Sequence, residues 1–258
     1  MRLMKRILSA AAVLALSASL LVGCSSGTAS SVPVSASSAA ESTVSSVEET
    51  ASSAVDENEA AAAQLLNDLT GSYQELWPVI LADEYKQTWL DDCTALVGEE
   101  NAEAAFEKLS SMVTSDVYGE DAVEAYANGG GAYFCGFTND LATLTFDGET
   151  STISGTDKDG NVLFSHTYHY IGMEPVHGLY EFESDDADSG EFTYFFLAPD
   201  TSAETYHIEF RYGSDAEALS QYDAGEYAYW VASGISTDCD QTMIDNCIEL
   251  FCTENLAG

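Results

Sequence analysis

The stretch "LATLTFDGETSTISGTDKDGNVLFSHTYHYIG", residues 141–172, decides the fold class because it is typical of short β-strands separated by tight turns. The turn signals are Asp147-Gly148 and Asp159-Gly160, dipeptides that tolerate the positive φ of a hairpin turn. Three more strands are predicted in residues 177–184, 190–198 and 203–213. This series predicts an up-and-down antiparallel barrel, or a strongly curved sheet, built from about residues 133–212.

Helices are predicted before and after these strands. Residues 57–90 begin with strong helix formers and carry apolar residues at roughly helical spacing, and residues 101–131 add two shorter helices that end at three glycines. A short helix is expected in residues 214–223, and a terminal helix in residues 238–255 with Asp238 or Asp240 near its N-cap. We expect the helices that precede the strands to lie together on one side of the barrel.

The first 24 residues have the organisation of a secretory signal, with a basic start, a short apolar run and small residues before a cleavage site. The run ends in Leu-Val-Gly-Cys, which resembles a bacterial lipobox and implies that Cys24 becomes the lipidated first residue; the alternative is an ordinary signal peptide. Residues 25–58 are rich in Ser, Ala and Glu and contain no aromatic residue, so they are interpreted as a disordered tether. The folded domain is therefore expected over residues 59–258.

Charge and cysteine content narrow the class of protein. Once the predicted signal is removed, four Lys and Arg remain against 44 Asp and Glu, a formal net charge of −40. Such a field repels nucleic acid and attracts cations, although a solvated acidic surface alone would also explain it. Five cysteines follow Cys24, so at least one thiol stays outside any intramolecular disulfide, and no CxxC spacing indicates a structural zinc site.

One candidate metal motif lies in the last predicted strand, His207-Ile208-Glu209. Because side chains alternate across a strand, His207 and Glu209 share one face, which we expect to be either solvent or a polar cavity, while Ile208 faces the core. The pair can hold one metal ion, but taken alone the motif favours a solvated polar face over a metal site. The sequence contains no HExxH, GxSxG or phosphate-binding loop, so we expect no enzyme activity.

Residues 186–219, "DADSGEFTYFFLAPDTSAETYHIEFRYGSDAEAL", resemble the segment that identifies the ZinT (YodA) family of zinc-binding proteins. Further similarity is found in "GSYQELWPVILADEYKQTW" (71–89), "AVEAYANGGGAYFCGFTNDLATLTFDG" (122–148) and "EYAYWVASGISTDCDQTMIDNCIELF" (226–251). The resemblance implies a calycin-like, lipocalin-related β-barrel with a helical subdomain, a mainly β fold with helices. This expectation agrees with the fold class inferred from the strand and helix patterns.

The resemblance also implies a set of metal ligands, with departures from the family pattern. The family's His-x-His pair corresponds here to His207 and Glu209, so a carboxylate replaces the second imidazole. The family's remaining His can be aligned in two ways. Counting from the Gly-Glu-Phe-x-Tyr segment aligns it with Asp200, whereas matching the family's Ala-Pro to Ala198-Pro199 aligns it with Phe195. Asp200 is preferred because its side chain can ligate, which makes Asp200, His207 and Glu209 the predicted metal ligands.

An imidazole with two carboxylates can bind Zn²⁺, but less selectively against harder divalent ions such as Mn²⁺ or Ca²⁺ than three imidazoles would. The function implied is that of a lipid-anchored zinc-binding protein on the extracytoplasmic face of the cell membrane, active in zinc acquisition or homeostasis, with a metal transporter as possible partner. The alternative is a metal-free calycin-like barrel that binds a small apolar ligand or a protein partner.

Overall fold

The computed structural model describes residues 57–257. The predicted signal peptide, the predicted lipidation site Cys24 and nearly all of the predicted tether therefore lie outside the described residues. Within the described part, no helix combines the length and the apolar character that crossing a membrane requires.

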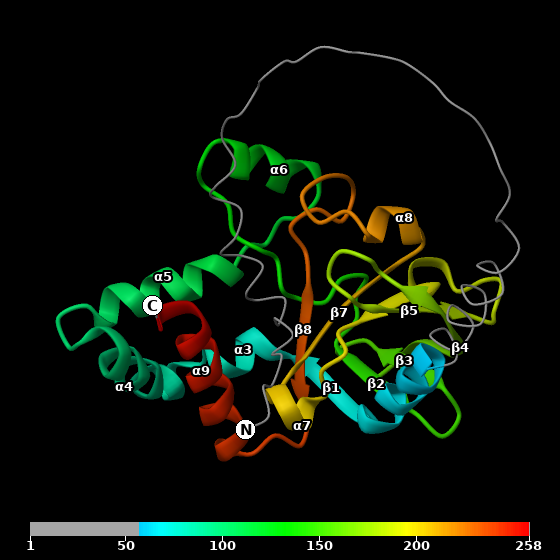
Figure 1. The fold of residues 1–258 in the computed structure, drawn as a ribbon, viewed down its shortest axis with the longest axis horizontal. Helices are drawn as coiled ribbons and strands as arrows, with labels where there is room; N and C mark the ends of the chain where they lie inside the picture. Colours follow the sequence, from blue (N-terminus) through cyan, green and yellow to red (C-terminus); the bar gives the residue numbers. More distant parts are fainter. Residues whose placement is uncertain (1–56, 258) are drawn as a thin grey trace, which may run out of the picture.

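Eight antiparallel strands close into a barrel in which each strand pairs with the next and the last pairs with the first (Figure 1). This up-and-down order, which lipocalins share, confirms the expected barrel with helices. The strands are β1 (Gly71–Glu75), β2 (Thr143–Asp147), β3 (Thr152–Thr156), β4 (Val162–Met173), β5 (Tyr180–Ser184), β6 (Tyr194–Leu197), β7 (Ile208–Gly213) and β8 (Ala232–Ser236).

The two strands that close the barrel were not predicted. Residues of β1 were assigned to a helix, but β1 pairs with β2 on one side and with β8 on the other. Its five residues lack helical or strand character of their own, and pairing to two neighbours that are distant in sequence decides their structure. In β8, a Cβ on Gly234 would lie 3.0 Å from Cγ1 of Ile208, so a small residue is required where the barrel interior is crowded.

The two predicted hairpin turns use glycine for different reasons. Gly160 has a φ of 82°, the positive value that the Asp-Gly signal indicates. A Cβ on Gly148 would instead lie 2.4 Å from Cα of Asn67, because the helix of residues 57–68 packs directly on this turn. The second glycine therefore allows the close approach of a helix to the barrel end.

The barrel interior is a packed aromatic core. Phe195 and Tyr212 are completely buried there, and their rings lie 5.4 Å apart between centroids. Others in this core are Phe146, Phe182 and Phe210. The expected inward position of Ile208 is confirmed, since it is 3% exposed within the same core.

A second core holds the helical subdomain against the outer wall of the barrel (Figure 1). Its contact with the wall includes Ile235 of β8, and Trp89 joins two helices by donating Nε1–H to the Ile80 carbonyl at 2.7 Å. Asp240 caps the terminal helix by accepting a hydrogen bond from the Met243 amide at 2.9 Å, as predicted. The helices are α3 (Leu76–Ile80), η1 (Asp83–Tyr85), α4 (Lys86–Val97), α5 (Ala102–Val113), α6 (Glu120–Ala127), η2 (Gly190–Phe192), α7 (Ser202–Thr205), α8 (Ala216–Leu219) and α9 (Gln241–Leu256).

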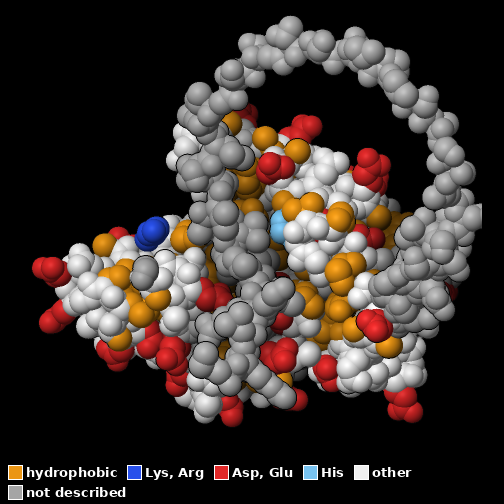
Figure 2. Space-filling model, in the orientation of Figure 1, with side chains coloured by type: hydrophobic (Ala, Val, Ile, Leu, Met, Phe, Trp, Pro, Cys, Tyr) orange, Lys and Arg blue, Asp and Glu red, His pale blue; other side chains and the backbone are white. Residues whose placement is uncertain are grey.

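The surface is acidic, as the composition predicts. Asp and Glu side chains are spread around the visible face in Figure 2, and Lys or Arg shows there over the helical part. A surface of this sign raises the local concentration of cations through its long-range field.

Candidate metal-binding site

The outer face of β7 and of the residue before it carries a row of buried polar side chains. His207, Glu209 and Arg211 alternate with Ile208 and Phe210, which belong to the barrel core. The side chains of His207 and Glu209 are 11% and 12% exposed, because α3 and α9 cover this part of the wall. Their face is therefore neither open solvent nor the barrel interior, but the junction between barrel and helical subdomain.

His207 is held by a tight turn that comes before the strand. The strand predicted over residues 203–213 begins only at Ile208, because α7 occupies the first residues and Tyr206 has a φ of 65°. The turn brings the Thr205 carbonyl to 2.7 Å from His207 Nδ1, and Thr205 Oγ1 donates to the His207 carbonyl at 2.7 Å. A carbonyl can only accept, so Nδ1 carries a proton and Nε2 is directed to other partners.

Nε2 of His207 faces Glu209, with 3.6 Å between Nε2 and Oε1. The Cys247 thiol is a second neighbour of the ring, with Sγ 3.9 Å from Nδ1. Burial alone would lower the pKa of His207, but the neighbouring Cys247 and Glu209 side chains outweigh it and raise that pKa well above its usual value. The raised pKa and the 3.6 Å contact favour a protonated His207 beside Glu209.

A small enclosed cavity adjoins this pair. Its free volume is about 10 Å³, enough for one water-sized occupant. The barrel contributes His207 and Glu209. The helices contribute an apolar rim and two side chains of a type that can ligate a metal ion, Cys247 and Glu254. The helix residues are Leu76, Trp77, Ile80, Cys247, Leu250, Phe251 and Glu254.

The separation of Nε2 and Oε1 also fits two ligands of one metal ion. Ligands at ~2.0–2.1 Å from a tetrahedral Zn²⁺ lie about 3.4 Å from each other, close to the observed 3.6 Å. The hydrogen bond from Nδ1 to a backbone carbonyl is the arrangement that orients most metal-ligating histidines. Two ligands of the expected chemistry are thus placed beside a cavity of ionic size.

The third predicted ligand, Asp200, is half-buried between β6 and α7 and is not among the residues that line this cavity. Within residues 57–257, no three or more His, Cys, Asp or Glu side chains are grouped to hold one ion. Asp200 as a ligand stays a prediction. Glu254, an exposed residue of α9, was missed although it lines the cavity. Its signal was the spacing Cys247, Phe251, Glu254, which puts the three on one helix face.

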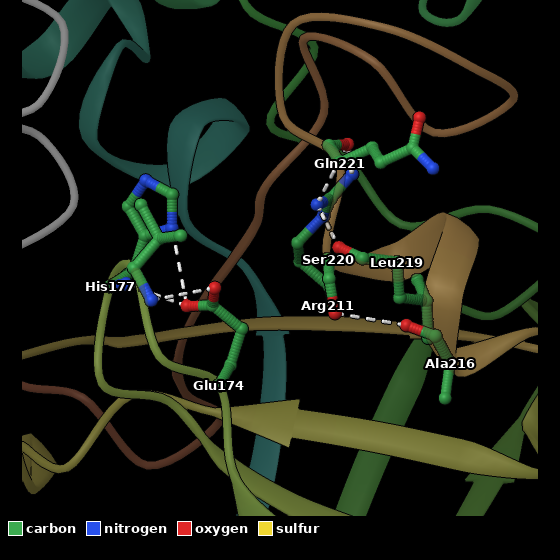
Figure 3. A network of polar contacts seen from close by, with 8 residues as sticks. Glu174, His177, Arg211, Ala216, Leu219, Ser220 and Gln221 are labelled. Atoms are coloured by element: carbon green, nitrogen blue, oxygen red, sulfur yellow. Dashed lines mark hydrogen bonds and ion pairs between the residues drawn. The ribbon is translucent and has the colours of Figure 1, made fainter. Parts of the chain in front are cut away.

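Arg211, two residues beyond Glu209, has a different environment (Figure 3). Its guanidinium is fully buried, lies 4.2 Å from the centre of the Tyr222 ring, and donates to the backbone carbonyls of Leu219, Gln221 and Tyr227. Nearby, the buried Glu174 carboxylate accepts hydrogen bonds from backbone amides, including that of His177 at 2.6 Å. The hydrogen bonds of Arg211 tie the end of α8 and the segment after it to the barrel wall.

Comparison with known proteins matches no family model and no curated protein. Among solved structures, the zinc-bound ZinT-like domain of AdcA from Streptococcus pneumoniae is similar at 16% identity and a TM-score of 0.45, over 72% of this chain and 89% of that chain. The zinc-bound AdcA of the same organism is similar at 15% identity and a TM-score of 0.42, over 70% of this chain and 34% of that chain.

Proposed function

We propose that this chain is a divalent-metal-binding protein that takes Zn²⁺ between His207 Nε2 and Glu209. The observation that carries the proposal is the buried pair with 3.6 Å between Nε2 and Oε1, in which Nδ1 is anchored to the Thr205 carbonyl. In the metal-free protein the proton on Nε2 balances the carboxylate. Zn²⁺ replaces that proton, and binding therefore releases it.

Glu254 is the third ligand that we propose. It extends from α9 and lines the same cavity as His207 and Glu209, and its carboxylate is a ligand of the chemistry that Zn²⁺ accepts. Asp200, the residue preferred in the sequence comparison, is the competing third ligand. In either case a water molecule completes a four-coordinate site.

One imidazole and two carboxylates make a site that exchanges its ion rather than one that retains it permanently. Carboxylates favour harder ions more than imidazoles do, so we expect Mn²⁺ to compete with Zn²⁺. The acidic surface supports capture, since it concentrates cations of any kind around the cavity. These properties suit a protein that collects zinc and passes it on, with a metal transporter as partner, and no enzyme activity is proposed.

The proposed setting is the extracytoplasmic face of the cell membrane, with the chain anchored through lipid on Cys24. The support is the lipobox-like end of the signal and the tether-like composition that follows it. Replacing Cys24 by Ala is expected to release the protein from membranes or to leave it unprocessed. Unchanged membrane association of that variant, measured by fractionation, would contradict the anchor.

The alternative function, binding of an apolar ligand inside the barrel, is not favoured. Large aromatic side chains that are almost completely buried occupy the interior, including Phe195, Phe210 and Tyr212. A ligand would have to displace these side chains, at the cost of well-packed apolar contacts.

Isothermal titration with Zn²⁺, Mn²⁺ and Ca²⁺ tests the proposed function. The parent chain should bind one Zn²⁺ and release a proton, detected as a dependence of the heat on the ionisation enthalpy of the buffer. Glu209→Gln should weaken binding on the order of 10-fold or more, because a neutral amide replaces an anionic ligand. The matched control, Glu149→Gln in the exposed β2–β3 turn, should bind like the parent. Equal affinity in both variants would reject the site.

A further inference from the structure

Two cysteines meet in the centre of the helical subdomain, far apart in sequence. Cys93 lies in α4 and Cys252 in α9, and their Sγ atoms are 3.9 Å apart. Both side chains are completely buried in the second core, where Trp89 also lies. Nothing in the proposed zinc site requires this pair, so its placement needs a separate explanation.

The other three described cysteines have different surroundings. Cys247 adjoins His207, and the Cys135 carbonyl accepts a hydrogen bond from the Ser233 amide on the barrel wall. Cys239 is half-buried before α9 begins. Cys93 and Cys252 are thus the two thiols that the fold brings into direct contact.

We propose that Cys93 and Cys252 form a disulfide in the mature protein. The sulfur atoms must approach from 3.9 Å to the S–S bond length of ~2.05 Å. Rotation of two side chains and a small shift of α9 against α4 can supply this movement. The proposal goes beyond metal binding and assumes only that the chain folds in an oxidising compartment, as its signal-like start suggests.

The chemistry is thiol–disulfide exchange with an external disulfide, either of an extracytoplasmic oxidoreductase or of a small molecule such as oxidised glutathione. One thiolate attacks that disulfide, forms a mixed disulfide and expels one thiol. The second thiolate then displaces the other, so the two cysteines lose two protons and two electrons and the oxidant becomes two thiols.

Burial indicates when this reaction takes place. Both thiols are completely buried, so an external disulfide cannot reach them in the folded subdomain. We therefore expect the bond to form during folding, before α4 and α9 pack together, and to resist reductants afterwards unless the subdomain opens.

The bond would also stabilise one wall of the zinc cavity. Cys252 follows Phe251 and precedes Glu254, two residues of α9 that line that cavity. A covalent link from α9 to α4 would hold this wall in place with or without metal.

The test maps the cysteines of the full chain, isolated from the extracytoplasmic fraction of the cells that express it. The chain is denatured without reductant, alkylated, digested with a Glu-specific protease and analysed by mass spectrometry. Cleavage at Glu249 separates Cys247 from Cys252, so the two positions are distinguished. We expect one cross-linked peptide pair that contains Cys93 and Cys252, and alkylated Cys135, Cys239 and Cys247. Five alkylated thiols, or a different pairing, would overturn the proposal.

Thermal unfolding provides a second measurement. Reduction of the parent chain should lower Tm by about 5–15 °C, the shift expected when a long loop loses its cross-link. Cys93→Ala, Cys252→Ala and the double variant should each have a low Tm that no longer responds to reductant. The control Cys239→Ala should respond like the parent, and a parent Tm that is insensitive to reductant would contradict the disulfide. Neither measurement uses zinc, so both still test the disulfide if the proposed metal site is wrong.

Discussion

The two polar sites on the outer face of β7 differ in how their charges are satisfied. Arg211 gives its terminal nitrogens to backbone carbonyls that hold one segment in place. His207 and Glu209 instead face each other at 3.6 Å beside a cavity of about 10 Å³. A buried cation that is bonded to the backbone stabilises the fold, whereas a proton between two side chains can be exchanged for a metal ion. The comparison therefore predicts effects on stability at one site and on binding at the other.

The largest effect is expected at Arg211. Arg211→Met keeps an apolar stem but leaves the carbonyls of Leu219, Gln221 and Tyr227 without their charged donor. Loss of several hydrogen bonds to a charged group should lower the free energy of unfolding by about 3 kcal/mol or more. Urea denaturation measures the loss, and titration of the folded variant should give zinc affinity close to that of the parent. An Arg211→Met variant that is as stable as the parent but fails to bind zinc would show that Arg211 serves metal binding and not the fold.

Removal of His207 should have the next largest effect. His207→Ala deletes the nitrogen ligand, and zinc affinity should fall about 100-fold, or about 2.8 kcal/mol. His169→Ala is the matched control, because that histidine is 52% exposed on β4 and pairs with Asp185. Both variants are compared by titration at one pH. If they bind zinc equally well, His207 and Glu209 are a structural ion pair.

The change in zinc affinity for each unit of pH should be smaller than the loss caused by His207→Ala. Because the pKa of His207 is raised, zinc must displace a proton already above pH ~6.5, and affinity should fall tenfold per unit below the folded-state pKa. An unperturbed imidazole would produce this decline around pH 6.5, and the raised pKa of His207 moves it to higher pH. Titrations between about pH 8 and pH 6 measure the slope, and a flat profile would contradict ligation by Nε2.

The raised pKa of His207 has the opposite effect on the stability of the metal-free protein, which should decrease as pH rises. A raised pKa means that the folded state holds its proton more tightly than the unfolded state does. The stabilisation is complete below the unfolded pKa of ~6.5 and is lost as pH rises through the raised folded value. Denaturation of the metal-free chain should therefore show the contribution of His207 weakening toward alkaline pH, while zinc affinity increases.

The smallest effect is expected from the third ligand. Glu254→Gln should weaken zinc binding on the order of 5-fold, since an exposed carboxylate contributes less than a buried one. Asp200→Asn is the direct comparison, because each change removes one charge at constant size. The variant with the larger loss identifies the ligand, and no loss in either would mean that water completes the site.

Much of the fold followed from the sequence because its signals are local. The Asp159-Gly160 turn, the Asp240 cap and the strands from β2 to β7 depend on residues a few positions apart, and the structure confirms them. The closing strands β1 and β8 did not follow, since they pair with each other across most of the chain, as Tyr73 does with Ser236. The late start of the last predicted strand, at Ile208, was also missed, because Tyr206 adopts a left-handed conformation that its residue type does not predict.

The sequence by itself determined that this protein is an acidic, mainly β domain with helices and with His207 and Glu209 on one face of a strand. Only the tertiary structure decided what covers that face, because α9 comes from the far end of the chain and brings Cys247 and Glu254 with it. It also decided the direction of the His207 pKa shift, because that shift arises from burial and neighbouring side chains rather than from residue type. Local patterns determine periodicity and turns, whereas burial, charge pairing and cavities depend on contacts between distant segments.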